Sequence, residues 1–147
     1  LCQNNGFAIS TPFRKEYGIQ FAAQRAAGYG FPGVTLDGRD PVTTYHVAKQ
    51  AVARARSGEG PTLIECLVDR LGAHSSEDDQ RRYRSAEELE QLAQHDCLDQ
   101  FRKRLVEEGI LGEKQHAEYG GGGKEGVNQG TRTELRPRGR VARAASL

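Results

Sequence analysis

The sequence predicts an α/β fold with a parallel sheet, and two observations carry that prediction. Residues 31–38 and 62–68 each have the length and the apolar, β-branched composition of a strand. Between them, residues 41–57 show the apolar spacing of a helix that buries one face. A strand, a helix and a second strand within this length form a βαβ unit, which has parallel strands and a right-handed crossover.

The helix over 41–57 has start and face signals of its own. Asp40 suits the N-cap position and Pro41 suits the first helical position. Its apolar side chains recur at intervals of three and four, so we expect one buried face made of Val42, Tyr45, Ala48, Val52 and Ala55. Upstream, residues 1–12 are typical of a strand end and its turn, and residues 17–30 of a short helix or loop that Gly30 ends.

A long polar loop, residues 69–85, follows the strand expected at 62–68. Open α/β sheets place their ligands at the carboxyl ends of strands, and this loop contains His74, a residue type that transfers protons near neutral pH. Ser85 and Glu88 have the spacing of a capping box, which predicts a helix over 86–94. Composition alone favours a solvated loop with an incidental histidine; the alternative is a catalytic site.

The turn signal Asn4-Asn5-Gly6 follows the first expected strand. The simple interpretation is a turn and nothing more. The functional interpretation is a cation or ligand site, because asparagine supplies a neutral oxygen that suits a hard ion such as Mg²⁺.

Charge and cysteine content narrow the class of protein. The 147 residues carry a formal net charge of +1, which gives no reason to expect a nucleic-acid partner. No apolar run approaches the length of a membrane span, so we expect no membrane partner. The cysteines lack metal-ligand spacing, which fits free thiols in a reducing compartment, and Cys66 is predicted to be a core residue. Because the chain begins at Leu1 rather than Met, we expect a fragment of a longer protein.

The chain changes character after a further helix expected over 97–108. Residues 120–147 begin with consecutive glycines and hold six basic and two acidic residues, with almost no apolar periodicity. Such a segment buries too little apolar surface to offset its ordering entropy, so we expect one domain over 1–119 and a disordered basic Gly/Arg-rich tail over 120–147. A nucleic-acid-binding arm is a weaker alternative, because the tail has no aromatic side chain for base stacking.

Three segments together resemble the alpha subunit of thiamine-diphosphate-dependent 2-oxo acid dehydrogenases: Gln3 to Pro12, Val34 to Asp40, and Arg70 to Ser85. The resemblance covers residues 2–118 and is closest to the branched-chain enzyme. That alpha subunit has an Asn-Asn-Gly-Tyr-Ala-Ile-Ser-Thr-Pro segment and a loop with Gly-His-His-Ser-Thr-Ser-Asp-Asp. The loop of the pyruvate enzyme, Gly-His-Ser-Met-Ser-Asp-Pro, fits less well.

The resemblance implies roles for individual residues. Asn5 matches a side-chain ligand of Mg²⁺, and Phe7 matches the residue that gives its main-chain carbonyl to the same ion. Ile9 matches the residue that supports the bent conformation of thiamine diphosphate, and Gln3 stands where branched-chain enzymes commonly have an arginine near the diphosphate. His74 matches the active-site histidine, which is expected to contact the cofactor and to assist acyl transfer.

The resemblance also implies a regulated loop. Ser75 and Ser85 match two serines that a kinase phosphorylates in mitochondrial relatives, so both are regulatory candidates. A phosphate on Ser75 would add charge beside the loop acids and disorder the loop. We expect the acids and arginines of the loop to pair with one another and order it: Asp78, Asp79, Arg81, Arg82 and Arg84.

The fold implied by the resemblance is the carboxyl-terminal half of a parallel-sheet thiamine-diphosphate-binding fold, with helices on both faces. The implied enzyme uses thiamine diphosphate and Mg²⁺ to decarboxylate a branched-chain 2-oxo acid oxidatively and to acylate a lipoyl group. Its implied partners are a beta subunit, in a heterotetramer, and a lipoyl-bearing acyltransferase core, in the bacterial cytoplasm or the mitochondrial matrix. The family's opening Gly-Asp-Gly is missing here, so the chain alone is expected to be inactive. Two alternatives remain: a pyruvate dehydrogenase alpha subunit, and a non-catalytic module for subunit assembly.

Overall fold

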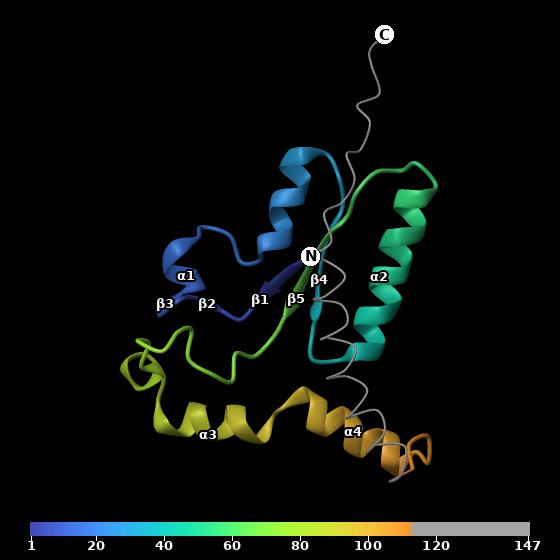
Figure 1. Ribbon diagram of the computed structural model, residues 1–147. Helices are drawn as coiled ribbons and strands as arrows, with labels where there is room; N and C mark the ends of the chain where they lie inside the picture. Colours follow the sequence, from blue (N-terminus) through green and yellow to red (C-terminus); the bar gives the residue numbers. More distant parts are fainter. Residues whose placement is uncertain (113–147) are drawn as a thin grey trace, which may run out of the picture. The chain divides into compact units, whose positions relative to one another are not determined.

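The computed structural model describes residues 1–112 (Figure 1). These residues belong to two compact units, of which the first is Leu1–Phe101 and the second starts at Arg102. The predicted domain boundary at 119/120 and the predicted disordered tail lie outside the described residues. The sheet and the polar loop both belong to the first unit.

The main sheet has three parallel strands in the order β1-β5-β4, as the βαβ pattern predicted. The strands are β1 (Cys2–Asn4), β4 (Gly33–Asp37) and β5 (Leu63–Leu67). β5 lies in the centre, and its middle residues Ile64, Glu65 and Cys66 are all buried. The prediction that Cys66 is a core residue is therefore confirmed. A separate antiparallel pair, β2 (Phe7–Ala8) and β3 (Thr11–Pro12), leads into a single helical turn, α1 (Phe13–Glu16).

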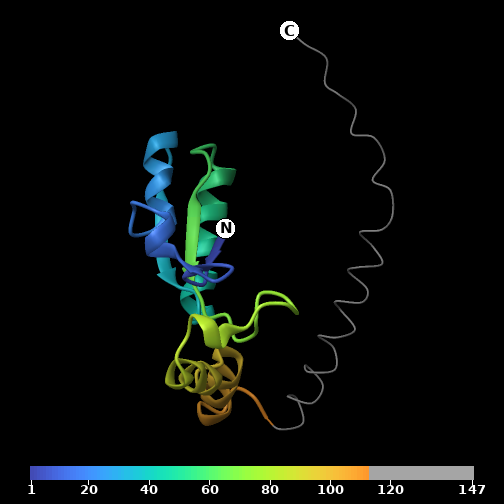
Figure 2. The ribbon, with the colours of Figure 1, turned by 90° about the vertical axis from the view of Figure 1, so that its left-hand side faces the viewer.

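Helical segments cover both faces of the sheet. On one face, α2 (Pro41–Arg56) packs Val47, Ala48 and Ala51 against the core residues Leu36, Ile64 and Cys66. On the other face lies the 3-10 helix η1 (Ala22–Tyr29), whose Ala23 and Ala26 are buried. Figures 1 and 2 show these two segments on opposite sides of the strands.

η1 approaches the sheet so closely that only glycine fits at one contact. A Cβ atom on Gly33 would lie 2.1 Å from the carbonyl oxygen of Ala23. η1 ends where Gly30 adopts a left-handed conformation, with φ of 77°. The sequence predicted this stop, because glycine adopts that conformation without steric cost.

The predicted start of α2 is confirmed, but of its predicted inner face only Ala48 packs on the sheet. Asp40 caps the helix by accepting a hydrogen bond from the amide of Val42 (3.0 Å). Val42, Tyr45 and Val52 are 40%, 61% and 47% exposed, however, because the helix carries two apolar stripes. Val47 and Ala51 pack on the sheet beside Ala48, and the small alanines let the helix lie close to the strands.

Three helical segments follow the sheet: η2 (Gln80–Arg82), α3 (Ala86–Gln94) and α4 (Cys97–Glu107). The predicted capping box of α3 is confirmed, with both Ser85–Glu88 hydrogen bonds present (2.9 and 3.1 Å). α4 crosses the boundary between the two units and is followed by Gly109, with φ of 69°. Within residues 1–112, no helix is long and apolar enough to span a membrane.

Candidate functional site

The carboxyl ends of the three parallel strands meet at one edge of the sheet. The carbonyl of Asn4, at the end of β1, accepts a hydrogen bond from the amide of Val68 (3.0 Å). The carbonyl of Leu67, at the end of β5, accepts one from the amide of Gly38, just after β4 (2.8 Å). The Asn4-Asn5-Gly6 turn and the polar loop therefore leave the sheet side by side, at the edge where such folds bind ligands.

Two asparagine side chains build the turn after β1. Asn4 Oδ1 accepts a hydrogen bond from the amide of Gly6 (2.9 Å), and Asn5 Oδ1 accepts one from the amide of Phe7 (3.1 Å). Gly6 has φ of 79°, a conformation that glycine adopts without strain. Asn5 and Phe7, the predicted metal residues, line one cavity of about 520 Å³ together with Phe13, Tyr83 and others.

Ile9 has a strained backbone at this edge of the sheet. Its φ is 59°, and among the described residues no other non-glycine residue has a positive φ. A β-branched residue rarely adopts this conformation. Its carbonyl is held by Arg70 Nη2 at 2.7 Å, and the residue is 54% exposed. The surrounding contacts thus hold an aliphatic side chain out of the protein at the position predicted to support the cofactor.

We expect Ile9→Gly to stabilise the chain by about 1 kcal/mol, because glycine adopts the left-handed conformation without the clash. The free energy of unfolding, measured in urea, tests this expectation. Ile9→Val is the matched control: it keeps the β-branch and should leave stability within about 0.5 kcal/mol of the parent chain. An unchanged or lower stability of Ile9→Gly would show that the conformation at residue 9 is not strained.

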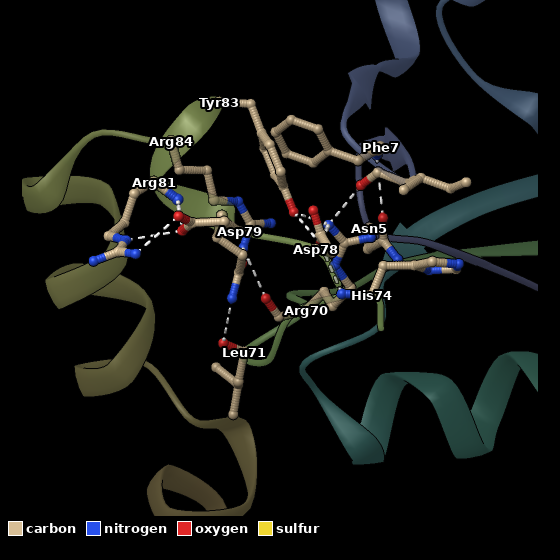
Figure 3. Close-up of polar contacts among 12 residues, drawn as sticks. Asn5, Phe7, Arg70, Leu71, His74, Asp78, Asp79, Arg81, Tyr83 and Arg84 are labelled. Carbon is tan, nitrogen blue, oxygen red and sulfur yellow. Dashed lines mark hydrogen bonds and ion pairs between the residues drawn. The ribbon is translucent and has the colours of Figure 1, made fainter. Parts of the chain in front are cut away.

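The polar loop is organised around the carboxylate of Asp78 (Figure 3). Its Oδ2 accepts hydrogen bonds from the hydroxyl of Tyr83 (2.6 Å) and from the amide of His74 (2.8 Å). Arg70 Nη2 donates to the Tyr83 oxygen (2.8 Å) and lies 3.9 Å from the same carboxylate. The side chains of Arg70 and Asp78 are only 14% and 8% exposed. The Tyr83 hydroxyl and the His74 amide hold the pKa of Asp78 below its ordinary value.

Aromatic and cationic contacts tie this loop to the turn after β1. The ring of Phe7 lies 5.4 Å from that of Tyr83, and the guanidinium of Arg84 lies 4.8 Å from the centre of the Phe7 ring. Arg84, which is 8% exposed, also donates to the carbonyl of Arg70 (2.8 Å) and to Gln80 Oε1 (2.5 Å). Phe7 therefore contributes its ring as well as its main chain to the site.

The predicted catalytic residue has a fixed backbone and a free ring. The amide of His74 is bonded to Asp78, whereas its side chain is exposed and points away from that carboxylate (Figure 3). Within residues 1–112, no hydrogen bond is made by the imidazole. Gln3 is also exposed; it lies on β1 in register with Cys66, on the face of the sheet opposite to Asn4. The structure brings Asn5, Phe7 and Ile9 close to the loop, whereas the side chains of His74 and Gln3 are exposed.

The two candidate phosphorylation sites differ in structure. Ser75 lies exposed in the loop, and its carbonyl accepts a hydrogen bond from the amide of Asp78 (3.2 Å). Ser85 is the N-cap of α3, where its hydroxyl accepts from the amide of Glu88. Ser85 thus has a structural role that accounts for its presence without modification.

The predicted pairing of loop acids with loop arginines is only partly confirmed. Asp79 and Arg81 pair at 2.8 Å, and this contact lowers the pKa of Asp79 to about 2. The acid that organises the loop, Asp78, instead contacts Tyr83 and Arg70, which the pairing rule did not include. A lone tyrosine in a polar loop was the available signal, since a half-buried tyrosine needs a partner for its hydroxyl.

Comparison with known proteins identifies the family. The model of the family described as dehydrogenase E1 component matches residues 1–132. The chain is 46% identical over 114 residues to the 2-oxoisovalerate dehydrogenase subunit alpha of Bacillus subtilis, which covers 78% of the chain and 34% of that protein. It is 43% identical over 112 residues to the 3-methyl-2-oxobutanoate dehydrogenase subunit alpha of Mycobacterium tuberculosis (76% and 30%).

A third relative is named for a different substrate. The pyruvate dehydrogenase E1 component subunit alpha of Staphylococcus aureus is 42% identical over 119 residues, which covers 80% of the chain and 32% of that protein. The chain therefore spans about a third of the length of the curated relatives it matches. With the parallel sheet, the asparagine turn and the Asp78-centred loop at one edge, the family match leads to one conclusion: the chain belongs to the dehydrogenase E1 component family.

Proposed function

We propose that this chain forms the metal-binding turn and the active-site loop of a 2-oxo acid dehydrogenase alpha subunit. The observation that carries the proposal is the meeting of the Asn4-Asn5-Gly6 turn and the Asp78-centred loop at the carboxyl edge of a parallel sheet, in a member of the E1 family. The complete enzyme decarboxylates a 2-oxo acid oxidatively and acylates a lipoyl group.

The residues of the turn fit a magnesium ion. Mg²⁺ prefers hard oxygen ligands and often binds phosphate oxygens at the same time. Asn5 Oδ1 and the Phe7 carbonyl would supply two neutral oxygens, and Asn5 is already oriented by its bond to the Phe7 amide (3.1 Å). A carbonyl-type oxygen has two lone pairs, so this bond leaves Asn5 able to bind an ion.

The fit extends to thiamine diphosphate. When bound, thiamine diphosphate supplies the carbon nucleophile and the electron sink that decarboxylation of a 2-oxo acid requires. Ile9 would support it with the exposed aliphatic chain described above, and Gln3 would lie near its diphosphate. His74 would donate or accept a proton near the reacting carbon, since its ring is exposed while its backbone is held by Asp78.

The proposed substrate is a branched-chain 2-oxo acid. The two relatives with the highest identities quoted above are named for branched-chain 2-oxo acids, and the relative named for pyruvate is only slightly less similar. The proposed partners are a beta subunit, in a heterotetramer of alpha and beta subunits, and the lipoyl-bearing acyltransferase. Ser75, exposed next to the loop acids, is the better candidate for a regulatory phosphate, because Ser85 is engaged as a helix cap.

Two chimaeras test this proposal. In one, residues 1–112 replace the matching segment of the Bacillus subtilis subunit; in the other, they replace that of the Staphylococcus aureus subunit. Each is assembled with its own beta subunit and assayed for 2-oxo acid-dependent acylation of a lipoyl domain. We expect activity that requires thiamine diphosphate in the first chimaera, and less in the second.

The outcomes separate the alternatives. Higher activity in the Staphylococcus aureus scaffold would favour the pyruvate enzyme. Assembly of both chimaeras with full cofactor binding but no activity would contradict the catalytic proposal and favour a module for subunit assembly.

A further inference from the structure

The only described residue with a large, completely buried side chain is an acid. Glu65, in the middle of β5, is 0% exposed. No ion pair of Glu65 is present within residues 1–112, and it points away from the apolar core between α2 and the sheet, toward η1. A buried carboxylate is costly unless it is fully hydrogen-bonded, so its retention in the central strand needs a reason.

Neutral donors surround this carboxylate: it accepts three hydrogen bonds, and the amide of Ala22 also lies beside it. Oε2 accepts from the amide of Ala23 (2.8 Å) and from the hydroxyl of Thr35 (3.1 Å). Oε1 accepts from the side-chain amide of Asn4, Nδ2, at 2.6 Å. Burial alone would raise the pKa of Glu65, but the bonds from the Ala23 amide and from Asn4 outweigh it and lower the pKa. The group is therefore an anion that only accepts hydrogen bonds.

An acceptor of this kind determines which way the Asn4 amide faces. The NH₂ group of Asn4 must point to Glu65. The side-chain oxygen of Asn4 therefore points to the opposite side, where it accepts a hydrogen bond from the amide of Gly6 (2.9 Å). A reversed Asn4 amide would set oxygen against the carboxylate and NH₂ against the Gly6 amide. The turn that presents Asn5 and the Phe7 carbonyl is thus linked, through one side chain, to a carboxylate 61 residues away in sequence.

We propose that Glu65 is a positioning residue for the metal site: it orients Asn4, and Asn4 shapes the turn that holds Asn5 and Phe7. This inference rests on the proposed function for its metal, whereas the link from Glu65 to the turn stands on the contacts above. A purely structural role for Glu65 would instead act equally through all of its donors.

The test uses the full chain and measures the turn directly, as the hydrogen-exchange rate of the Gly6 amide by NMR. Glu65→Gln replaces one acceptor oxygen by a donor, and we expect Gly6 to exchange about 10-fold faster. Thr35→Val is the matched control, because it removes another hydrogen bond to the same carboxylate without touching Asn4. It should change the Gly6 rate by less than about 2-fold.

A double variant supplies the rescue. In Asn4→Asp with Glu65→Gln, the amide introduced at position 65 donates to the carboxylate introduced at position 4, and that carboxylate still accepts a hydrogen bond from the Gly6 amide. Asn4→Asp alone sets two carboxylates against each other. We expect both single variants to speed Gly6 exchange and the double variant to return to within about 3-fold of the parent chain. Equal effects of Glu65→Gln and Thr35→Val, or no recovery in the double variant, would overturn the proposal.

The same variants are titrated with Mn²⁺, which shares the preference of Mg²⁺ for oxygen ligands and broadens nearby NMR signals. We expect broadening at Asn5 and Phe7, and an affinity about 10-fold weaker in Glu65→Gln that recovers in the double variant. Stronger Mn²⁺ binding by Asn4→Asp alone would mean that charge, not orientation, controls the site, and would overturn the proposal. No broadening at Asn5 in the parent chain would contradict the proposed metal site, while the Gly6 rates would still decide the role of Glu65.

Discussion

Replacing His74 by alanine in the active Bacillus subtilis chimaera is expected to lower the rate of lipoyl acylation by about 10²-fold or more. The imidazole is exposed at the ligand-binding edge, and within residues 1–112 no hydrogen bond is made by its ring. Such a group acts on charge that develops during the reaction, so its loss lowers the rate more than it lowers cofactor affinity. Steady-state kinetics and a thiamine diphosphate titration, run side by side, measure the two effects separately.

His46 offers the control for this substitution. It is exposed on α2, where its ring lies 5.5 Å from that of Tyr45, and it takes no part in the loop or the turn. His46→Ala should leave both the rate and the cofactor affinity unchanged. If His46→Ala and His74→Ala behave alike, or if His74→Ala weakens cofactor binding without slowing acyl transfer, the loop has no proton-transfer role.

Local signals in the sequence predicted those elements whose stability is itself local. The start of α3 follows from Ser85 and Glu88, which lie one helical turn apart and hydrogen-bond to each other. Gly30 likewise ends η1 through its own conformation. β5 was predictable for a different reason: its stability depends on pairing with β1 and β4, but its apolar run fits a strand buried on both faces.

The sequence did not predict the inner face of α2, because apolar side chains lie on more than one side of this helix. α2 carries two apolar stripes, and periodicity does not say which one meets the sheet. In the structure, Val47 and Ala51 pack on the sheet beside Ala48, and the exposed Tyr45 contacts Lys49 and His46 on the outer side. Helix packing is decided by the shape of the partner surface, which the helix sequence does not contain.

The site was predictable by position but not by contact. The strand ends and the polar residues after them gave the edge of the sheet and the segments 4–9 and 69–85. The bonds that organise this edge join residues far apart in the chain: Arg70 to Ile9, and Glu65 to Asn4, each separated by 61 residues. No spacing rule covers such pairs, because they depend on how β1 and β5 are set side by side.

The largest structural effect in the loop is expected from Asp78→Ala. Its Oδ2 receives both the Tyr83 hydroxyl and the His74 amide, and Arg70, which is mostly buried, lies 3.9 Å away. Removal leaves these donors unsatisfied, so the loop should open more often. We expect a glutamate-specific protease to cleave after Glu77 about 10-fold faster, and the protection of the His74 amide against hydrogen exchange to fall by a similar factor.

The neighbouring acid, Asp79, provides the control for Asp78→Ala, and the pH dependence of loop order provides a second test of Asp78. Asp79 pairs with Arg81, which is 81% exposed, and caps η2 by accepting a hydrogen bond from the amide of Arg81 (3.1 Å). Asp79→Ala removes these local contacts but leaves the contacts of Asp78 in place, so it should speed cleavage clearly less than Asp78→Ala does. The pKa of Asp78 is lowered by its bonds to Tyr83 and His74. Its contribution to loop order is therefore complete above the unfolded pKa of about 4 and is lost only as the pH falls through the lower, folded value. The parent chain should show this acid-dependent loss of His74 protection and Asp78→Ala should not; a loss near neutral pH, or one shared by both chains, would assign loop order to another group.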